Sequence, residues 1–236
     1  MFQDTQSTRS ASRTILFYGL CLFCCGAIFS LVGLHSEANA GTLTQNYVDS
    51  FGATAPDGPA PYATSFFDDG GSAGTVTLTI DVAATVGEAD VAALYYSLDP
   101  SLDATDLSIV RTGGDGPIAG DISISLGTDA FQADGDGLYD ILIDLPPPPG
   151  SQSARFQAGE TLVFAISGIP TLVAADFDFL AAPGGGAGPY KSVARFLSTG
   201  EGGEDSDWVG TPEPSTLLLT GLGSLALVAR RRRARA

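Results

Sequence analysis

Four aspartates close together in the sequence are the residues best suited to chemistry. Asp134, Asp136, Asp140 and Asp144 surround an Asp-Gly-Asp-Gly stretch. Carboxylates two and four residues apart can converge on one Ca²⁺, which takes six to eight oxygen ligands. Asp-Gly pairs are equally typical of hairpin turns, because glycine readily adopts positive φ angles. The pattern leaves two interpretations open, a calcium site and a turn whose acids face solvent.

The residues that most other catalytic sites need, cysteine and histidine, occur only in the N-terminal segment. All three cysteines and the only histidine, Cys21, Cys24, Cys25 and His35, lie in the first 40 residues. If that segment is removed, as argued below, the rest of the chain has neither thiol nor imidazole. Such a chain has no Ser-His-Asp triad, no Cys-His nucleophile, no zinc finger and no disulfide scaffold.

The excess of acidic over basic residues limits the classes of molecule that this chain can bind. Between Gly41 and Gly210 there are four basic residues and 24 carboxylates, a net charge of −20. Such a surface repels phosphate backbones, so we expect no nucleic-acid partner. A glycoside hydrolase needs only two carboxylates, and Glu88 and Glu160 are the candidate glutamates near expected strands. For each glutamate, however, a solvated or turn-ending role is the more common one.

Residues 41–200 show the period of two that is typical of half-buried strands. Residues 75–82 alternate threonine with Val76, Leu78 and Ile80. Short strands of this kind, separated by Gly, Pro and Asp, predict an all-β domain, an antiparallel β-sandwich of about nine strands. The expected strands are 45–51, 75–82, 91–98, 107–111, 122–126, 139–145, 162–166, 174–180 and 192–198.

Aromatic residues in and after this domain have two possible roles, packing in the fold and binding a ligand at the surface. Tyr95 and Tyr96 are adjacent on an expected strand, so one ring should enter the core and the other face the surface. Trp208 should pack on the edge of the sandwich, although a surface aromatic side chain can also stack on a sugar ring. Residues 201–214 are expected to form a flexible linker.

The N-terminus has the features of a secretory signal peptide. Arg9 and Arg13 precede an uncharged run over residues 14–34, and Ala38-Asn39-Ala40 has the small-x-small pattern cut by signal peptidase. We therefore expect a signal helix within residues 1–40 and cleavage after Ala40. An uncleaved membrane anchor is the alternative, because the uncharged run is long enough to span a bilayer.

The C-terminus combines three features in a fixed order. Pro212-Glu213-Pro214 precedes an uncharged run, for which we expect a transmembrane helix over residues 215–229. At about 1.5 Å per residue this helix would be roughly 22 Å long, which is short for a bilayer core of about 30 Å. The arginine-rich tail, residues 230–236, should stay in the cytoplasm. Its arginines are Arg230, Arg231, Arg232, Arg233 and Arg235.

This order of proline motif, short apolar helix and arginine cluster resembles the PEP-CTERM sorting signal of Gram-negative bacteria. The resemblance covers residues 211–236, about a tenth of the chain. It implies recognition by an exosortase, a membrane-embedded protease, with cleavage near Pro212-Glu213-Pro214. It further implies transient anchoring in the inner membrane, followed by transfer of the body to the cell surface or the extracellular matrix.

Together these features predict an exported, non-catalytic surface protein with an acidic β-sandwich. Its expected partners are signal peptidase, exosortase, the membrane and an exopolysaccharide, and it needs no cofactor unless calcium binds. Two alternatives stay open: a calcium-dependent carbohydrate-binding or adhesion module that uses Asp134–Asp144, and a carboxylate-based polysaccharide hydrolase.

Overall fold

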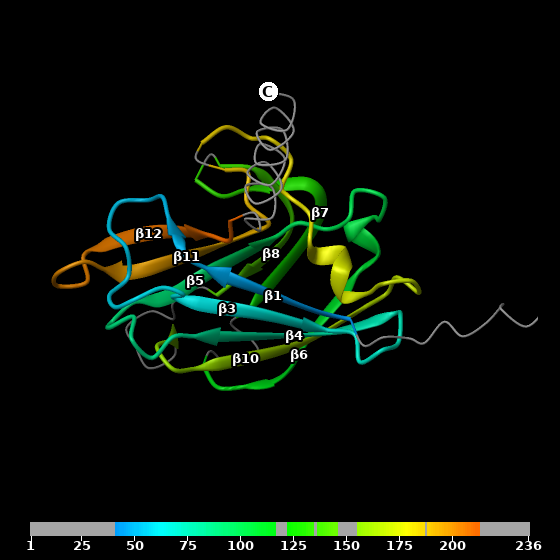
Figure 1. The fold of residues 1–236 in the computed structure, drawn as a ribbon, viewed down its shortest axis with the longest axis horizontal. Coiled ribbons are helices and arrows are strands. Elements are labelled where there is room, and N and C mark those ends of the chain that lie inside the picture. The colour runs from blue at the N-terminus through cyan, green and yellow to red at the C-terminus, as the bar shows by residue number, and fades with distance from the viewer. Residues whose placement is uncertain (1–40, 117–121, 135, 146–154, 187, 213–236) are drawn as a thin grey trace, which may run out of the picture. The chain divides into compact units, whose positions relative to one another are not determined.

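A computed structural model describes residues 41–116, 122–134, 136–145, 155–186 and 188–212 (Figure 1). In these ranges the chain forms twelve antiparallel strands and two short 3-10 helices, which confirms the all-β prediction, with more strands than the nine expected. None of the described helices is long and apolar enough to cross a membrane. The expected signal helix and the C-terminal membrane helix lie outside the described residues.

The strands form two sheets (Figure 1). The first sheet has the order β1-β3-β4-β10-β6, and the second has the order β2-β12-β11-β5-β8-β7, with β9 also paired to β5. The strands are β1 (Thr42–Tyr47), β2 (Asp49–Ser50), β3 (Ala63–Asp68), β4 (Thr75–Val82), β5 (Asp90–Tyr96), β6 (Ser108–Gly114), β7 (Ser123–Gln132), β8 (Leu138–Asp144), β9 (Phe156–Gln157), β10 (Thr161–Ser167), β11 (Ser192–Thr199) and β12 (Asp205–Gly210). The 3-10 helices are η1 (Ala104–Asp106) and η4 (Ala174–Phe177).

The main core lies between the two sheets. Alternate residues of each inner strand enter it, such as Val76, Leu78 and Ile80 of β4 from the first sheet. The Phe67 ring of the first sheet meets the Tyr96 ring of the second edge to face, with centroids 5.6 Å apart. Buried apolar faces of this kind supply the dominant stabilising free energy of a sandwich.

Three strands were not predicted from the sequence: β3, the two-residue β9 and β12. In β3 and β12 a buried polar residue interrupts the apolar pattern. In β3, the hydroxyl of buried Ser65 bonds the hydroxyls of Tyr47 and Tyr96 at 3.1 and 2.8 Å. In β12, buried Asp207 accepts hydrogen bonds from Ser50 Oγ at 2.6 Å and from the Gly52 N–H at 2.8 Å. A polar side chain can be buried in a core when hydrogen-bonding partners are available there. Those partners come from distant parts of the chain, so no local sequence pattern predicts such a residue.

Two local predictions are therefore corrected. Residues 201–214 are not simply a flexible linker, because β12 pairs with β11 and β2 and places Val209 in the core. The expected strand at 174–180 is instead η4, whose Phe177 ring stacks on Phe67 with centroids 4.5 Å apart. Asp176 stabilises the start of η4 by accepting a hydrogen bond from the Val173 N–H at 2.8 Å.

Candidate functional site

Asp136, in the turn between β7 and β8, is fully buried. Its carboxylate accepts hydrogen bonds from the Tyr139 hydroxyl at 3.1 Å and from the Gly188 N–H. Burial raises the pKa of Asp136, and these hydrogen bonds oppose the rise without cancelling it. The side chain therefore ties the turn to the segment that precedes β11.

Asp140, in β8, makes a similar connection elsewhere. One carboxylate oxygen accepts the Leu98 N–H and the other accepts the Asp129 N–H, both at 2.8 Å. Burial raises the pKa of Asp140, the two backbone hydrogen bonds lower it, and the charge of Asp129 raises it again. Asp140 also lines a pocket of about 310 Å³ together with Asp99 and Asp129.

The other two aspartates of the motif are exposed and point to no shared centre. Asp134 has a φ of 45°, a left-handed conformation suited to the turn, and Asp144 ends β8 opposite Ala93 and Ser123. Within the described ranges, no three His, Cys, Asp or Glu side chains gather as metal ligands. β7 and β8 form an antiparallel hairpin with Asp134 in the connection between them, and the structure does not bring the four aspartates together.

The glutamates considered for hydrolysis are likewise not brought together. Glu160 accepts a hydrogen bond from the Gln157 N–H at 2.7 Å, so its carboxylate closes the turn before β10. Glu88 lines a different hollow of about 510 Å³ with Asp57 and Glu201, and Glu160 is not part of that lining.

A group of aromatic side chains lies on the face of the second sheet that points away from the main core. We call it the aromatic strip: Phe51, Tyr95, Tyr139, Tyr190 and Trp208, which pack in a cluster separate from the main core. Tyr139 and Tyr190 are buried within this cluster, so Phe51, Tyr95 and Trp208 are the partly exposed rings of the strip. Tyr95 is half-buried, while Tyr96 next to it is buried in the main core, so the two rings lie on opposite faces as the sequence predicted, and the structure decides which one enters the core. Tyr95 is the centre of the strip, with ring centroids 5.7 Å from Trp208 and 5.8 Å from Tyr139.

The end of β12 makes room for the rest of the strip. The Phe51 and Tyr190 rings stack with centroids 5.1 Å apart, and the Tyr190 hydroxyl donates to Asp49 at 2.6 Å. A Cβ on Gly210 would lie 2.5 Å from Cγ of Tyr190. Glycine at this position therefore allows the Tyr190 ring to rest directly on the β12 backbone.

Opposite charges flank the centre of the strip. The guanidinium carbon of Arg195 lies 5.5 Å from the centre of the Trp208 ring, a cation–π arrangement. Burial raises the pKa of Tyr95, the charge of Asp144 adds to the rise and that of Arg195 opposes it. Arg195 is exposed, whereas Arg155 is bonded to Asp90 at 2.9 Å.

Sequence reasoning missed Arg195, Phe51 and Tyr190 as members of this face. Arg195 and Trp208 are direct partners across β11 and β12, but this pairing appears only once the register of the strands is known. Alternation of Arg195 with buried Ala194 and Phe196 is the one local signal that marked an outward residue.

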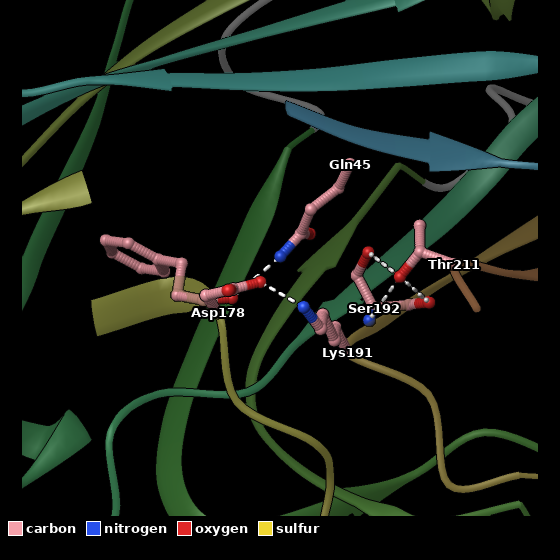
Figure 2. A network of polar contacts seen from close by, with 6 residues as sticks. Gln45, Asp178, Lys191, Ser192 and Thr211 are labelled. Atoms are coloured by element: carbon pink, nitrogen blue, oxygen red, sulfur yellow. Dashed lines mark hydrogen bonds and ion pairs between the residues drawn. The ribbon is translucent and has the colours of Figure 1, made fainter. Parts of the chain in front are cut away.

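The last described residues connect the second sheet to the C-terminal segment (Figure 2). The Thr211 N–H donates to the Ser192 carbonyl at 3.0 Å, and the Thr211 hydroxyl accepts the Ser192 N–H at 3.0 Å. Beside them, Lys191 pairs with Asp178, and the Gln45 amide donates to the Phe177 carbonyl at 2.7 Å. The fold is therefore hydrogen-bonded up to Thr211, directly before the proline motif.

Most predicted processing residues fall outside the described part of the chain. Pro212 is described and exposed. Those outside are Ala38, Ala40, Glu213, Pro214, Arg230, Arg231, Arg232, Arg233 and Arg235.

Comparison with known proteins identifies the C-terminal segment. Residues 211–233 match the family described as the PEP-CTERM protein-sorting motif. No curated protein matches the chain. Among solved structures, the fold is similar to biomass-sensing modules of Rsgi-like proteins from Clostridium thermocellum, described as resembling the family 3 carbohydrate-binding module of the cellulosome. That match has 13% identity and a TM-score of 0.33, covering 75% of this chain and all of the other, and neither the fold nor a ligand is assigned from it.

Proposed function

We propose that this chain, which carries a PEP-CTERM sorting motif, is an exported protein whose β-sandwich an exosortase transfers to the cell surface or extracellular matrix. In this proposal the sandwich acts there without catalysis. The motif at residues 211–233 is the observation that carries the proposal. Such a motif implies export and recognition by exosortase.

The end of the fold is compatible with this processing. β12 ends at Gly210, and Thr211 is hydrogen-bonded to Ser192. Cleavage at or after exposed Pro212 would leave every strand of the sandwich within the released product. The products of such a cut would therefore be an intact sandwich and a short membrane segment.

The test is to express the full chain in hosts with and without an exosortase, and to measure the mass and location of the product. We expect a shortened, released sandwich only when exosortase is present. Deletion of residues 230–236 should leave the chain uncut, because it removes the positive charges that keep the C-terminus in the cytoplasm.

A matched control replaces the five tail arginines with lysine. Lysine keeps the charge that sets the orientation, so cleavage should persist if charge is what the tail provides. Equal processing of the wild type and the deletion variant, or processing without exosortase, would overturn the proposal.

The aromatic strip supports a second role, the binding of a neutral polysaccharide. Flat aromatic rings stack on the apolar faces of sugar rings, and Arg195 and Asp144 supply a donor and an acceptor for hydroxyl groups beside Tyr95. The net charge of −20 between Gly41 and Gly210 repels polyanions, which favours an uncharged polymer.

The only tryptophan of the chain, Trp208, belongs to the strip, so its fluorescence reports on this face directly. Titration with neutral polysaccharides should shift its emission, and Tyr95→Ala should weaken binding about threefold to tenfold. Phe66→Ala, a half-buried aromatic residue on β3 of the other sheet, is the matched control and should leave affinity unchanged. Equal losses in both variants would contradict a role for the strip.

The same titration, run with calcium and with a chelator, addresses the calcium-dependent alternative. Binding that needs calcium and disappears in Asp134→Asn would place the ligand at the β7–β8 turn. Binding that is unaffected by the chelator would favour the strip.

A further inference from the structure

The first residue after the expected signal peptidase site is held against a buried carboxylate. The Gly41 N–H donates to Asp69 Oδ1 at 2.8 Å, and the Asp69 N–H donates to the Gly41 carbonyl at 3.1 Å. Asp69 is 7% exposed. Its carboxylate also accepts the N–H groups of Gly71 at 2.9 Å and Ala174 at 3.3 Å.

Asp69 lies so close to Gly41 that no side chain fits there. A Cβ on Gly41 would overlap Asp69 Oδ2 and would lie 3.3 Å from Asp69 Cγ. Oδ1 binds the Gly41 nitrogen while Oδ2 lies beside the Gly41 Cα, so the whole carboxylate group faces this residue.

We propose that Asp69 forms a prebuilt binding site for the α-ammonium group of Gly41 after signal peptidase has acted. The inference rests on the export in the proposed function. Hydrolysis breaks the C–N bond between Ala40 and Gly41 and consumes one water molecule. The Ala40 carbonyl carbon gains the oxygen of the water and becomes a carboxylate, and both protons of the water end on the Gly41 nitrogen, which becomes –NH₃⁺. An amide hydrogen bond thereby becomes an ion pair.

The surroundings of Asp69 favour a cation. Burial alone would raise the pKa of Asp69, but its three backbone hydrogen bonds outweigh that effect and hold the pKa below its ordinary value. Asp176 of η4 interacts electrostatically with Asp69 and also with Asp99. Asp68, the chain neighbour on β3, accepts the Gly70 N–H, and Lys191 is paired with Asp178. An arriving ammonium therefore meets Asp69 and the further negative charge of Asp176.

This pairing predicts a definite pH dependence. An α-amino group has an ordinary pKa of about 7.7–8.0, and pairing with Asp69 should raise it in the folded protein. The stabilisation from the ion pair is then fully present below the ordinary pKa and is lost as pH rises through the raised value.

The experiment uses the processed chain, isolated with its membrane segment from a host that lacks exosortase. Lys191 is the only lysine of the chain, so Lys191→Arg leaves the N-terminal amine as the only reactive one. The rate of its acetylation is measured against pH. We expect a midpoint at least about one pH unit above that of an ordinary α-amine, equal to about tenfold slower reaction near neutral pH.

Asp69→Asn should return the midpoint to its ordinary value, and Asp68→Asn, its chain neighbour, should not. If Asp69→Asn fails to fold, a chain with one extra residue before Gly41 keeps Asp69 but moves the ammonium about 3.8 Å away. That chain should titrate normally. An ordinary midpoint in the processed chain, or a raised midpoint in the extended one, overturns the proposal.

N-terminal sequencing separates this inference from the export proposal. If export produces a different N-terminus, a chain cut to begin at Gly41 by a site-specific protease still tests the Asp69 site. Exosortase cleavage at the other end is scored independently by mass. Either proposal can therefore fail while the other stands.

Discussion

Three buried carboxylates behave differently in two regions of this molecule. Asp69, at the end of the first sheet near η4, accepts three backbone N–H groups, and its pKa is lowered. Asp136 and Asp140, around the β7–β8 hairpin, accept two hydrogen bonds each, and their pKa values are raised. All three side chains have little exposed surface, but desolvation is weaker at Asp69, which also accepts one more hydrogen bond, and both differences favour its charged form.

The opposite pKa shifts correspond to two structural roles of a buried aspartate. Asp69 is a charged acceptor that links Gly41 before β1, Gly71 in the turn after β3 and Ala174 of η4. Its negative charge strengthens these hydrogen bonds. Asp136 and Asp140 hold loops in place at some cost from desolvation, and protonation relieves part of that cost. A motif of acids in a sequence therefore does not by itself indicate a metal site.

The largest effect should come from removing the charge of Asp69. We expect Asp69→Asn to lower the free energy of unfolding by about 2–4 kcal/mol, because three segments lose hydrogen bonds to a charged acceptor. Chemical denaturation at neutral pH measures this loss. Asp68→Asn, whose carboxylate accepts the exposed Gly70 N–H, is the control, with an expected change within about 0.5 kcal/mol. Equal losses in the two variants would contradict a specific role for the charge of Asp69.

The second effect is an opposite response to pH. For Asp136 and Asp140, whose pKa values are raised, stability should fall as pH rises from about 3.9 through those values, at up to about 1.4 kcal/mol per unit for each proton released. For Asp69, stability is lost as pH falls below about 3.9. Denaturation of Asp136→Asn/Asp140→Asn across this range should show a flatter slope above pH 4 than the wild type. An unchanged slope would contradict the assignment.

A smaller change is expected at the Asp136 hydrogen bond. Tyr139→Phe removes the hydroxyl donor and should cost about 1–2 kcal/mol in the free energy of unfolding at neutral pH. It should also raise the pKa of Asp136 further, so the loss should shrink at low pH. Tyr62→Phe at the edge of the main core is the control, and a loss as large as that of Tyr139→Phe would show that the hydroxyl bond is not special.

The smallest expected effect is that of calcium. Because the four aspartates of the motif do not converge, added calcium should leave the melting temperature unchanged within about 1 °C. A clear rise that disappears in Asp134→Asn and Asp144→Asn would instead show that the turn gathers its acids around the ion.

Sequence patterns predicted the sandwich where apolar residues alternate without interruption. β4 was predicted with its bounds, and β5, β8, β10 and β11 were predicted closely. Recognition failed at β3 and β12, where Ser65 and Asp207 occupy core positions among partners from distant parts of the chain. The same limit applied to the site: one of Tyr95 and Tyr96 was expected to face outward, but which one, and its neighbours Arg195 and Tyr190, were not foreseen.

The sequence by itself determined the all-β class, the sorting motif and the acidic charge, because alternation, an ordered C-terminal pattern and composition are all read along the chain. Only the tertiary structure decided which acids carry hydrogen bonds, which aromatic rings share a face, and that Gly41 meets Asp69. Many of those contacts join residues far apart in the chain, such as Gly41 with Asp69, which are 28 positions apart. They depend on strand order and register, which no local pattern contains.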